Sequence, residues 1–196
     1  MNSFGEPFWR WENGLGNKFC DDVIRFSNTL KKRQGQTRDP TPGANDLTNK
    51  RHRDSKIIWM SEKWIYKELL KFVDLANTDA KWNFNLGKAE AIQYTRYDSN
   101  NYYHWHVDQV QNDDKTHVRK LSICVNLTDP KDFEGGDFWI SIPHPIPEET
   151  KNMRLDFMKK RGSVVVFPSY IYHRVTPVIS GTRHSLVNWV QGANWK

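Results

Sequence analysis

Two histidines and an aspartate in this chain have the residue types and spacing to hold one metal ion. His106 and Asp108 are two residues apart. If their segment is a β-strand, both side chains project from one face, and an imidazole nitrogen and a carboxylate oxygen can reach the same ion. His173 follows the apolar run at residues 163–167, and a neighbouring strand can carry it beside the first pair. Since a single histidine is more often a surface or core residue than a ligand, the surrounding residues decide the case.

An arginine and a serine further along the chain suit the binding of a carboxylate. Arg183 comes ten residues after His173, and Ser185 shares a face with it if this segment is a strand. The guanidinium is a rigid, permanently charged fork that can grip a carboxylate through two hydrogen bonds. Two histidines and one carboxylate on one side of an ion, with the other side open, form the arrangement of non-haem Fe(II) oxygenases. The pattern therefore predicts an iron site beside an arginine that binds an acidic ligand. A surface ion pair at Arg183 is the less favoured interpretation.

A series of short motifs runs through residues 90–192. In order they are Tyr97, Tyr103, His106-x-Asp108, Glu134-Gly135-Gly136-Asp137, Phe167-Pro168-Ser169, His173-Arg174-Val175-Thr176-Pro177-Val178, Gly181-x-Arg183 and Trp189-Val190-Gln191. This series resembles the 2-oxoglutarate- and Fe(II)-dependent dioxygenases, specifically the prolyl 4-hydroxylase-like branch with its PKHD-type members. The terminal segment is the most specific part of the resemblance, and nothing before residue 90 carries a comparable signature.

The resemblance implies a hydroxylase with Fe(II) as its metal, 2-oxoglutarate and O2 as cosubstrates, and ascorbate as a reductant. In this family, oxidative decarboxylation of 2-oxoglutarate to succinate and CO2 drives hydroxylation of an unactivated C–H bond. The resemblance also assigns metal binding to His106, Asp108 and His173. Arg183 would bind the distal carboxylate of 2-oxoglutarate, helped by Ser185 and Tyr97. Asp108 also favours hydroxylation over halogenation, because related halogenating enzymes lack that carboxylate.

Two points of register stay open at this stage. His104 and His106 are also two residues apart, so they could form the ligand pair and leave Asp108 outside the coordination sphere. The order of the motifs favours His106 with Asp108, and His104 then lines the substrate pocket or orients a ligand. Tyr94 or Tyr102 could take the roles of Tyr97 or Tyr103 after a small change of strand register. The remaining candidate pocket residues are Asn126 and Trp189.

The composition indicates a soluble protein that works in a reducing compartment. The 196 residues suffice for one well-filled domain, and no apolar run reaches the roughly 18 residues of a membrane span. Cys20 and Cys124 cannot make a disulfide framework, and the chain starts without an export signal, so the expected location is the cytoplasm. A net charge of +6 leaves nucleic-acid binding conceivable, but short clusters such as Lys50-Arg51-His52-Arg53 are more often solvated, and no nucleic-acid motif accompanies them.

The apolar patterns predict two helices followed by strands. Helical spacing from Leu15 to Leu30 indicates a helix over residues 17–32, and Ser61 can cap a second helix that ends at residues 77–79. Alternating or apolar runs then predict strands at residues 82–86, 89–97, 121–127, 138–142, 163–167 and 183–190. The expected fold is mainly β, a double-stranded β-helix (jelly-roll) barrel packed against N-terminal helices.

Three polar segments complete the expected single domain of residues 1–196. Residues 33–56 read as a flexible loop or loose hairpin within an N-terminal support (residues 1–89), and are a candidate substrate lid over the core (residues 90–192). Residues 109–117 and the Pro-rich residues 143–149 read as loops, so their His117 and His144 are expected to be solvent-exposed. The form of residues 153–158 stays open.

The substrate is not determined by a barrel and a triad. The resembled branch favours a prolyl residue of a peptide or protein, and the aromatic residues Trp105, Trp139, Tyr170 and Tyr172 would suit a ring or an extended chain at the mouth. A free amino acid or small metabolite is the alternative and would need a closed pocket. A nucleic-acid dealkylase is favoured by charge alone. A metal-binding barrel without turnover is the alternative outside enzymes, but it would have no need of Arg183.

Overall fold

The computed structural model describes residues 6–35, 52–109, 116–142 and 150–195. Its larger sheet contains, in spatial order, β1 (Trp9–Trp11), β11 (Val164–Pro168), β7 (His117–Asn126), β14 (Arg183–Ala193), β5 (Ile92–Tyr97), β4 (Lys56–Met60) and β2 (Arg33–Gln34). The smaller sheet contains β10 (Lys151–Arg154), β9 (Phe138–Ile142), β12 (Tyr172–Val175), β6 (Tyr102–His106) and β3 (Arg53–Asp54). A third, two-stranded sheet pairs β13 (Val178–Gly181) with β8 (Phe133–Gly135).

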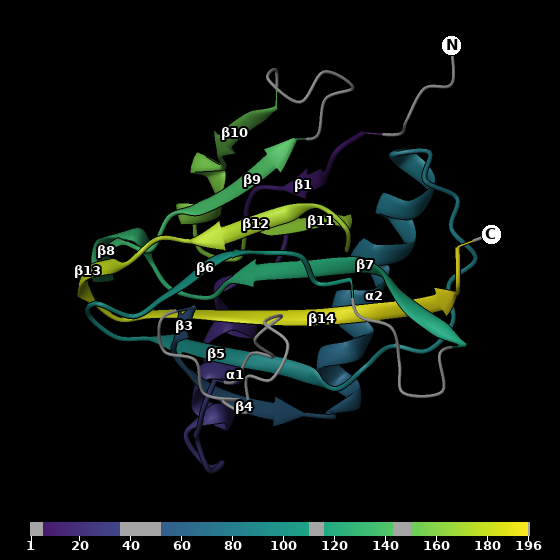
Figure 1. Ribbon diagram of the computed structural model, residues 1–196. Helices are drawn as coiled ribbons and strands as arrows, with labels where there is room; N and C mark the ends of the chain where they lie inside the picture. The colour runs from purple at the N-terminus through teal and green to yellow at the C-terminus, as the bar shows by residue number, and fades with distance from the viewer. Residues whose placement is uncertain (1–5, 36–51, 110–115, 143–149, 196) are drawn as a thin grey trace, which may run out of the picture.

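The two larger sheets lie against each other, and the helices α1 (Asn17–Ser27) and α2 (Lys63–Asp79) cover the outer side of the seven-stranded sheet (Figure 1). One core lies between the helices and this sheet, and includes Ile65 and Leu69 of α2 with Leu121 and Ile123 of β7. A second core lies between the sheets and includes Phe167. This arrangement confirms the mainly β architecture with N-terminal helices that the sequence predicts.

Strand β7 explains why the alternation in its sequence is so strict. Leu121, Ile123 and Val125 belong to the core under the helices, whereas Ser122 and Cys124 point to the other face. That second face is also buried, because the smaller sheet covers it. Ser122 and Cys124, the small residues of β7, therefore face the space between the two sheets.

Both helices differ in detail from the expectation. Helix α1 ends at Ser27 and not at residue 32. The chain then continues in tight turns, in which Thr29 N–H donates to Phe26 O (3.0 Å) and Leu30 N–H donates to Ser27 O (3.2 Å). Helix α2 has Glu62 as its N-terminal capping residue instead of Ser61, whose backbone N–H donates to the Glu62 carboxylate (2.8 Å). It includes the predicted end residues and stops at Asp79.

The strand expected at residues 82–86 is absent from this described segment, where the backbone is irregular. The Asn77 side chain binds Phe84 instead, accepting from its N–H (2.9 Å) and donating to its carbonyl (3.0 Å). The next predicted strand, at residues 89–97, begins only at Ile92, and Ala89 makes an isolated bridge with Val190. The backbone of Phe84 is therefore bonded to the Asn77 side chain, and not to a neighbouring strand as the alternating pattern suggested.

Residues 33–56 are not one continuous loop. Their ends form β2 and β3, and β4 starts at Lys56. The middle, residues 36–51, lies outside the described residues, and so does most of the proposed lid. His117 is exposed as expected but is the first residue of β7, whereas His144 and residues 143–149 lie outside the described part. Residues 153–158 divide between β10 and a 3-10 helix at Asp156–Lys159.

No helix in the described parts of the chain has the length and apolar character needed to cross a membrane.

Candidate metal centre

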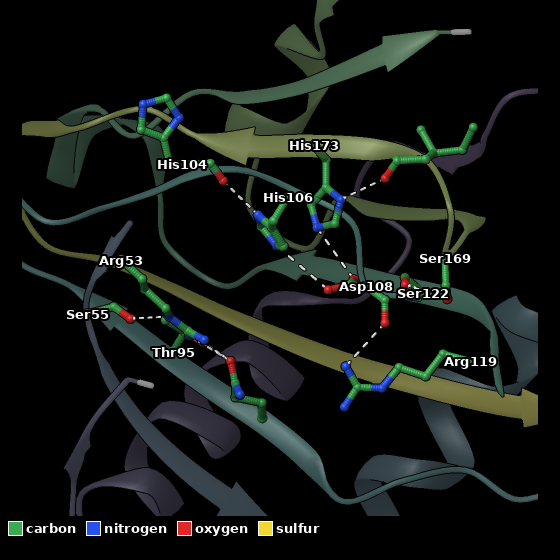
Figure 2. Close-up of polar contacts among 12 residues, drawn as sticks. Arg53, Ser55, Thr95, His104, His106, Asp108, Arg119, Ser122, Ser169 and His173 are labelled. Carbon is green, nitrogen blue, oxygen red and sulfur yellow. Dashed lines mark hydrogen bonds and ion pairs between the residues drawn. The ribbon is translucent and has the colours of Figure 1, made fainter. Parts of the chain in front are cut away.

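Strands β6 and β12 bring two histidines together at the centre of the smaller sheet. His106 is the last residue of β6, and His173 is its partner in the antiparallel register of β12. Asp108 follows β6 by two residues, and one of its carboxylate oxygens lies 3.7 Å from His106 Nε2. The other oxygen lies 3.4 Å from His173 Nε2 (Figure 2). The three candidate ligand atoms lie within 4.8 Å of one another, close enough to share one ion.

Backbone carbonyls orient both imidazoles. His106 Nδ1 lies 2.7 Å from His104 O, and His173 Nδ1 lies 3.1 Å from Ile171 O. Each Nδ1–H can donate to its carbonyl, which leaves Nε2 as the unprotonated nitrogen that faces Asp108. Burial holds the pKa of His106 well below its ordinary value, and the nearby His173 lowers it further. The His106 ring is therefore neutral and can accept a cation.

His104 contributes its backbone and not its ring. Its Nδ1 accepts from the Trp105 N–H (2.9 Å), the residue is exposed, and Figure 2 shows its ring directed away from the other two imidazoles. The group that can hold an ion contains Asp108 and leaves His104 out. The geometry therefore favours His106 with Asp108 over the pair His104 and His106.

Asp108 is fixed through its backbone. Its N–H donates to Ser169 O (2.9 Å), and Arg119 donates to its carbonyl (3.4 Å). Burial tends to raise the pKa of the Asp108 carboxyl, but His173, His106 and Arg119 outweigh it, and the net shift is downward. One oxygen of the ionised carboxylate, Oδ2, is buried and has no hydrogen-bond partner within the segments that the structure describes. An unpartnered buried anionic oxygen is costly, and a bound cation would compensate it. The site therefore fits a divalent metal.

Strand β14 forms the wall opposite the histidines. Arg183, Ser185 and Trp189 alternate along it and all line the same cavity as the triad. Arg183 is only 2% exposed, and its buried Nη1 has no hydrogen-bond partner in the described part of the chain. No carboxylate in the described residues pairs with this guanidinium, whose carbon lies 5.7 Å from the centroid of the Tyr97 ring. A buried arginine in this state fits an acidic ligand that reaches in beside the metal.

Two tyrosines predicted for the pocket line it. Tyr97 lies across from Arg183 in the β5–β14 pairing, and Tyr103 stacks on His106 with ring centroids 3.5 Å apart. Burial raises the pKa of Tyr103 to about 12, so its hydroxyl stays protonated. Tyr94 points instead into the core under the helices, and Tyr102 does not line the cavity. The structure thus favours Tyr97 and Tyr103 over Tyr94 and Tyr102 as pocket residues.

Asn126 does not line the cavity, which corrects its place among the candidate pocket residues. It is buried at the end of β7, and its amide donates to Thr128 O (2.9 Å) and Lys159 O (3.0 Å). These bonds close the turns that follow β7 and precede β11. The side chain is therefore used to hold two chain segments together.

Sequence reasoning missed part of the cavity wall. The additional lining residues are Arg53, Gln93, Cys124, Phe138, Val175 and Val187. The buried polar Gln93 and Thr95 share a face with Tyr97, and this spacing could have indicated a polar wall. Arg53 was assigned to a solvated basic cluster, but it is 4% exposed because β3 pairs with β6. No local pattern distinguishes it from its neighbours.

A jelly roll that holds a buried His-Asp-His group and an unpaired arginine in one cavity defines a metal-dependent oxygenase. Residues 92–191 match the family described as the 2OG-Fe(II) oxygenase superfamily, and the chain belongs to this superfamily. The similarity to PKHD-type members inferred from the motifs is confirmed.

Two curated relatives are PKHD-type hydroxylases from cyanobacteria. The proteins of Synechococcus sp. (strain CC9605) and Gloeothece citriformis (strain PCC 7424) are each 35% identical over 104 residues, which is 53% of this chain. The matched part is 43% of the first relative and 44% of the second, so the match spans less than half of their length.

Solved structures confirm the fold. The viral collagen prolyl hydroxylase of Paramecium Bursaria Chlorella virus-1, in complex with 2-oxoglutarate, superposes with a TM-score of 0.68 at 17% identity and covers 98% of this chain and 100% of that one. A Pseudomonas putida prolyl-4-hydroxylase gives 0.67 at 18% identity, with 96% and 94% covered. A Trichoplax adhaerens prolyl hydroxylase bound to a hypoxia inducible factor peptide fragment gives 0.65 at 18% identity, with 94% and 83% covered.

Proposed function

We propose that this protein is an Fe(II)- and 2-oxoglutarate-dependent dioxygenase that hydroxylates an unactivated C–H bond. One observation carries the proposal: in the same cavity, a buried carboxylate oxygen of Asp108 and a buried nitrogen of Arg183 have no hydrogen-bond partner among the described residues. A metal would satisfy the first, and the distal carboxylate of a 2-oxo acid would satisfy the second. A barrel without turnover would have no use for the arginine.

The residues of this chain have separable tasks in such a reaction. His106, Asp108 and His173 would hold the metal on one side and leave its other side open. Bound Fe(II) supplies the oxidation of a C–H bond with O2, coupled to decarboxylation of 2-oxoglutarate to succinate and CO2. Arg183 would fix the distal carboxylate of the cosubstrate by two charge-assisted hydrogen bonds.

Tyr97 and Ser185 would complete the grip on that carboxylate. Both line the cavity, and Tyr97 lies in register with Arg183 on the adjacent strand. Burial raises the pKa of Tyr97, so its hydroxyl is protonated and can donate to an anion. Trp189 lines the same cavity and would help to exclude water from the reacting atoms.

For the substrate, we infer a prolyl residue of a peptide or protein. The supporting facts are that the structural neighbours are prolyl hydroxylases and that one of them holds a peptide fragment. Exposed aromatic side chains at Tyr170 (40%) and Tyr172 (55%) offer flat apolar surfaces to an extended chain. Ascorbate is the inferred reductant, and the two free, buried cysteines agree with the inferred cytoplasmic location.

An anaerobic titration with Fe(II) and 2-oxoglutarate tests the assignment. Its readout is the visible charge-transfer band of a chelated 2-oxo acid. We expect a band that requires both additions, disappears in Asp108→Ala, and needs much more 2-oxoglutarate in Arg183→Ala. Arg161→Ala is the matched control, because that arginine pairs with Asp21 away from the cavity. Absence of the band from folded, iron-loaded protein would overturn the proposal in favour of a metal-binding barrel.

Turnover is then followed as succinate release under O2, first without a second substrate and then with prolyl peptides. A mass increase of one oxygen atom on the peptide identifies the hydroxylated residue. Hydroxylation of free amino acids with no reaction on peptides would replace the inferred substrate class and leave the dioxygenase assignment in place.

A further inference from the structure

A second buried arginine lines the cavity next to the metal ligands. Arg53 of β3 is 4% exposed and lies opposite Tyr103 in the β3–β6 pairing. Its guanidinium carbon lies 4.5 Å from the centroid of the Tyr103 ring, which itself stacks on His106 at 3.5 Å. Figure 2 shows Arg53 on one side of the triad and Arg119 on the other. Arg53 is therefore within the reach of a substrate placed at the metal.

Every described partner of Arg53 is uncharged. Its Nε donates to Ser55 Oγ (2.8 Å), and its Nη2 donates to Gln93 Oε1 (2.7 Å) and Thr95 Oγ1 (3.5 Å). Among the residues that the structure describes, none accepts a hydrogen bond from Nη1 and no carboxylate forms an ion pair with the guanidinium. These contacts hold the side chain in one position, and no counter-ion for its positive charge lies among the described residues. Such a charge is costly to bury unless an anion joins it.

A count of the charges around the site shows which positive group still needs a counter-ion. If the proposed function holds, the two charges of Fe(II) are balanced by Asp108 and by the carboxylate of 2-oxoglutarate that binds the metal. Arg183 balances the second carboxylate. Arg119 is already paired with Glu90, through Nε–Oε1 (2.7 Å) and Nη2–Oε2 (2.6 Å). Within the described cavity wall, Arg53 is then the positive charge that remains uncompensated.

We propose that Arg53 binds a carboxylate of the prime substrate. A peptide carbonyl could accept its hydrogen bonds, but it would leave the buried charge uncompensated, whereas a carboxylate neutralises it and matches the guanidinium fork. The carboxylate can belong to a small acid or to an acidic residue of a peptide. This inference rests on the proposed function and narrows its substrate to compounds with an acidic group close to the oxidised carbon.

Two pairs of probes test the proposal in the unaltered protein. One pair is N-acetyl-L-proline and its amide, and the other is a neutral-ended peptide that contains Pro-Glu and its Pro-Gln counterpart. Binding to protein loaded with Fe(II) and 2-oxoglutarate is measured without oxygen by calorimetry, and stimulated succinate release is measured with oxygen. We expect at least one acid to bind about 30-fold or more tightly than its neutral counterpart, the effect of losing one partner of a buried charge pair. A preference within the acetylproline pair indicates a small acid as substrate, and a preference within the peptide pair indicates an acidic peptide.

Variants then assign the preference to Arg53. Arg53→Gln should abolish the difference between acid and neutral probes, and Arg53→Lys should keep part of it, because the charge stays and the fork is lost. Lys56→Gln is the matched control: it removes a positive charge from β4, the next strand along the chain, where Lys56 forms a half-exposed surface pair with Asp98. The visible band of the metal-bound 2-oxo acid reports whether each variant is folded and loaded.

Three results would overturn the inference while the band is present. They are equal binding of acid and neutral probes by the wild type, a preference that survives in Arg53→Gln, and a lack of binding by every acid probe. If the wild-type protein shows no band, the failure lies in the proposed function and not in the role of Arg53.

Discussion

His106 and His173 lie directly opposite each other on the antiparallel strands β6 and β12, and the centroids of their rings are 4.1 Å apart. The spacing between the two imidazoles is therefore set by the sheet and does not depend on a loop. Each ring is also held by a carbonyl two residues before it in the chain. The protein alone thus places two nitrogens for a metal, and Asp108, two residues beyond the end of β6, offers the third ligand.

Because this arrangement exists only in the folded chain, metal binding should stabilise the protein. Fe(II) at 1,000 times its dissociation constant would add about 4 kcal/mol to the free energy of unfolding, and a chelator would remove it. Urea unfolding without oxygen, with and without Fe(II), measures the effect. In Asp108→Asn the metal-dependent gain should be lost, because the neutral amide is a much weaker ligand for Fe(II) than the carboxylate. A full gain in Asp108→Asn would show that the ion binds elsewhere.

The Glu90–Arg119 ion pair supports the metal site from outside it. Arg119 donates to Asp108 O (3.4 Å), and its guanidinium carbon lies 4.0 Å from the centroid of the Trp189 ring in the cavity wall. Glu90→Gln keeps the shape of its side chain but removes the charge that fixes Arg119. We expect the dissociation constant of Fe(II) to rise about tenfold, the usual cost of losing a group that orients a ligand.

A metal titration of Glu90→Gln against Asp21→Asn separates this effect from a general loss of charge. Asp21 pairs with Arg161 at the surface, so its variant should bind Fe(II) like the wild type. An unchanged affinity in Glu90→Gln would mean that the hydrogen bonds of Ser169 to the backbone of residues 108 and 109 hold Asp108 without help from Arg119.

Gly136 keeps Arg183 in place. Its φ is +60°, and a Cβ there would lie 3.0 Å from Arg183 Cδ and 3.0 Å from Val178 Cγ2. Gly136→Ala should therefore displace the guanidinium and raise the 2-oxoglutarate requirement roughly tenfold, in addition to a backbone cost of about 1–2 kcal/mol. The anaerobic visible band measures the cosubstrate requirement.

Gly181→Ala is the control for strain that does not act through the Arg183 side chain. Its φ is +77°, and the added Cβ would meet the backbone oxygen of Asp132, away from the Arg183 side chain. This variant should lose stability but keep the 2-oxoglutarate requirement of the wild type. If both alanine variants bind the cosubstrate normally, then close packing at Gly136 does not position Arg183.

Period-two patterns explain why much of the site could be predicted from the sequence. Arg183 and Ser185 share a face because alternate residues of β14 point the same way. Asp108 lies two residues beyond the end of β6, where its carboxylate is still beside His106. His173 follows an apolar strand, and the sheet brings it beside His106. Strands β9 and β11 were likewise visible as short apolar runs, so the barrel could be inferred from them.

The features that could not be predicted depend on contacts between distant segments. Arg53 becomes buried through pairing of β3 with β6 and a hydrogen bond to Gln93, forty residues away. Asn77 holds Phe84 and prevents the strand that alternation indicated. The His104 ring turns outward while its carbonyl holds His106, a division of roles that residue types do not reveal.

His184 should make the folded protein sensitive to acid. It lies next to Arg183 but on the opposite face of β14, where its Nδ1 is 2.6 Å from the Tyr94 hydroxyl and their rings stack at 5.6 Å. Burial lowers the pKa of His184 to about 4, and the positive charges of Arg96, Lys32 and Arg183 add to the shift against the opposing Asp98. The folded protein therefore keeps this ring neutral at a pH where the unfolded chain protonates it.

The unfolded chain then binds more protons, so stability is complete above pH of about 6.5 and falls as the pH drops toward about 4. At about 1.4 kcal/mol for each pKa unit, the loss from this residue approaches about 3 kcal/mol. His184→Gln cannot titrate, so its unfolding free energy, measured by urea between pH 7 and pH 4, should fall less than that of the wild type. Equal slopes for His184→Gln and the wild type would place the acid sensitivity at other groups, since only a residue whose pKa differs between the folded and unfolded states can contribute to it.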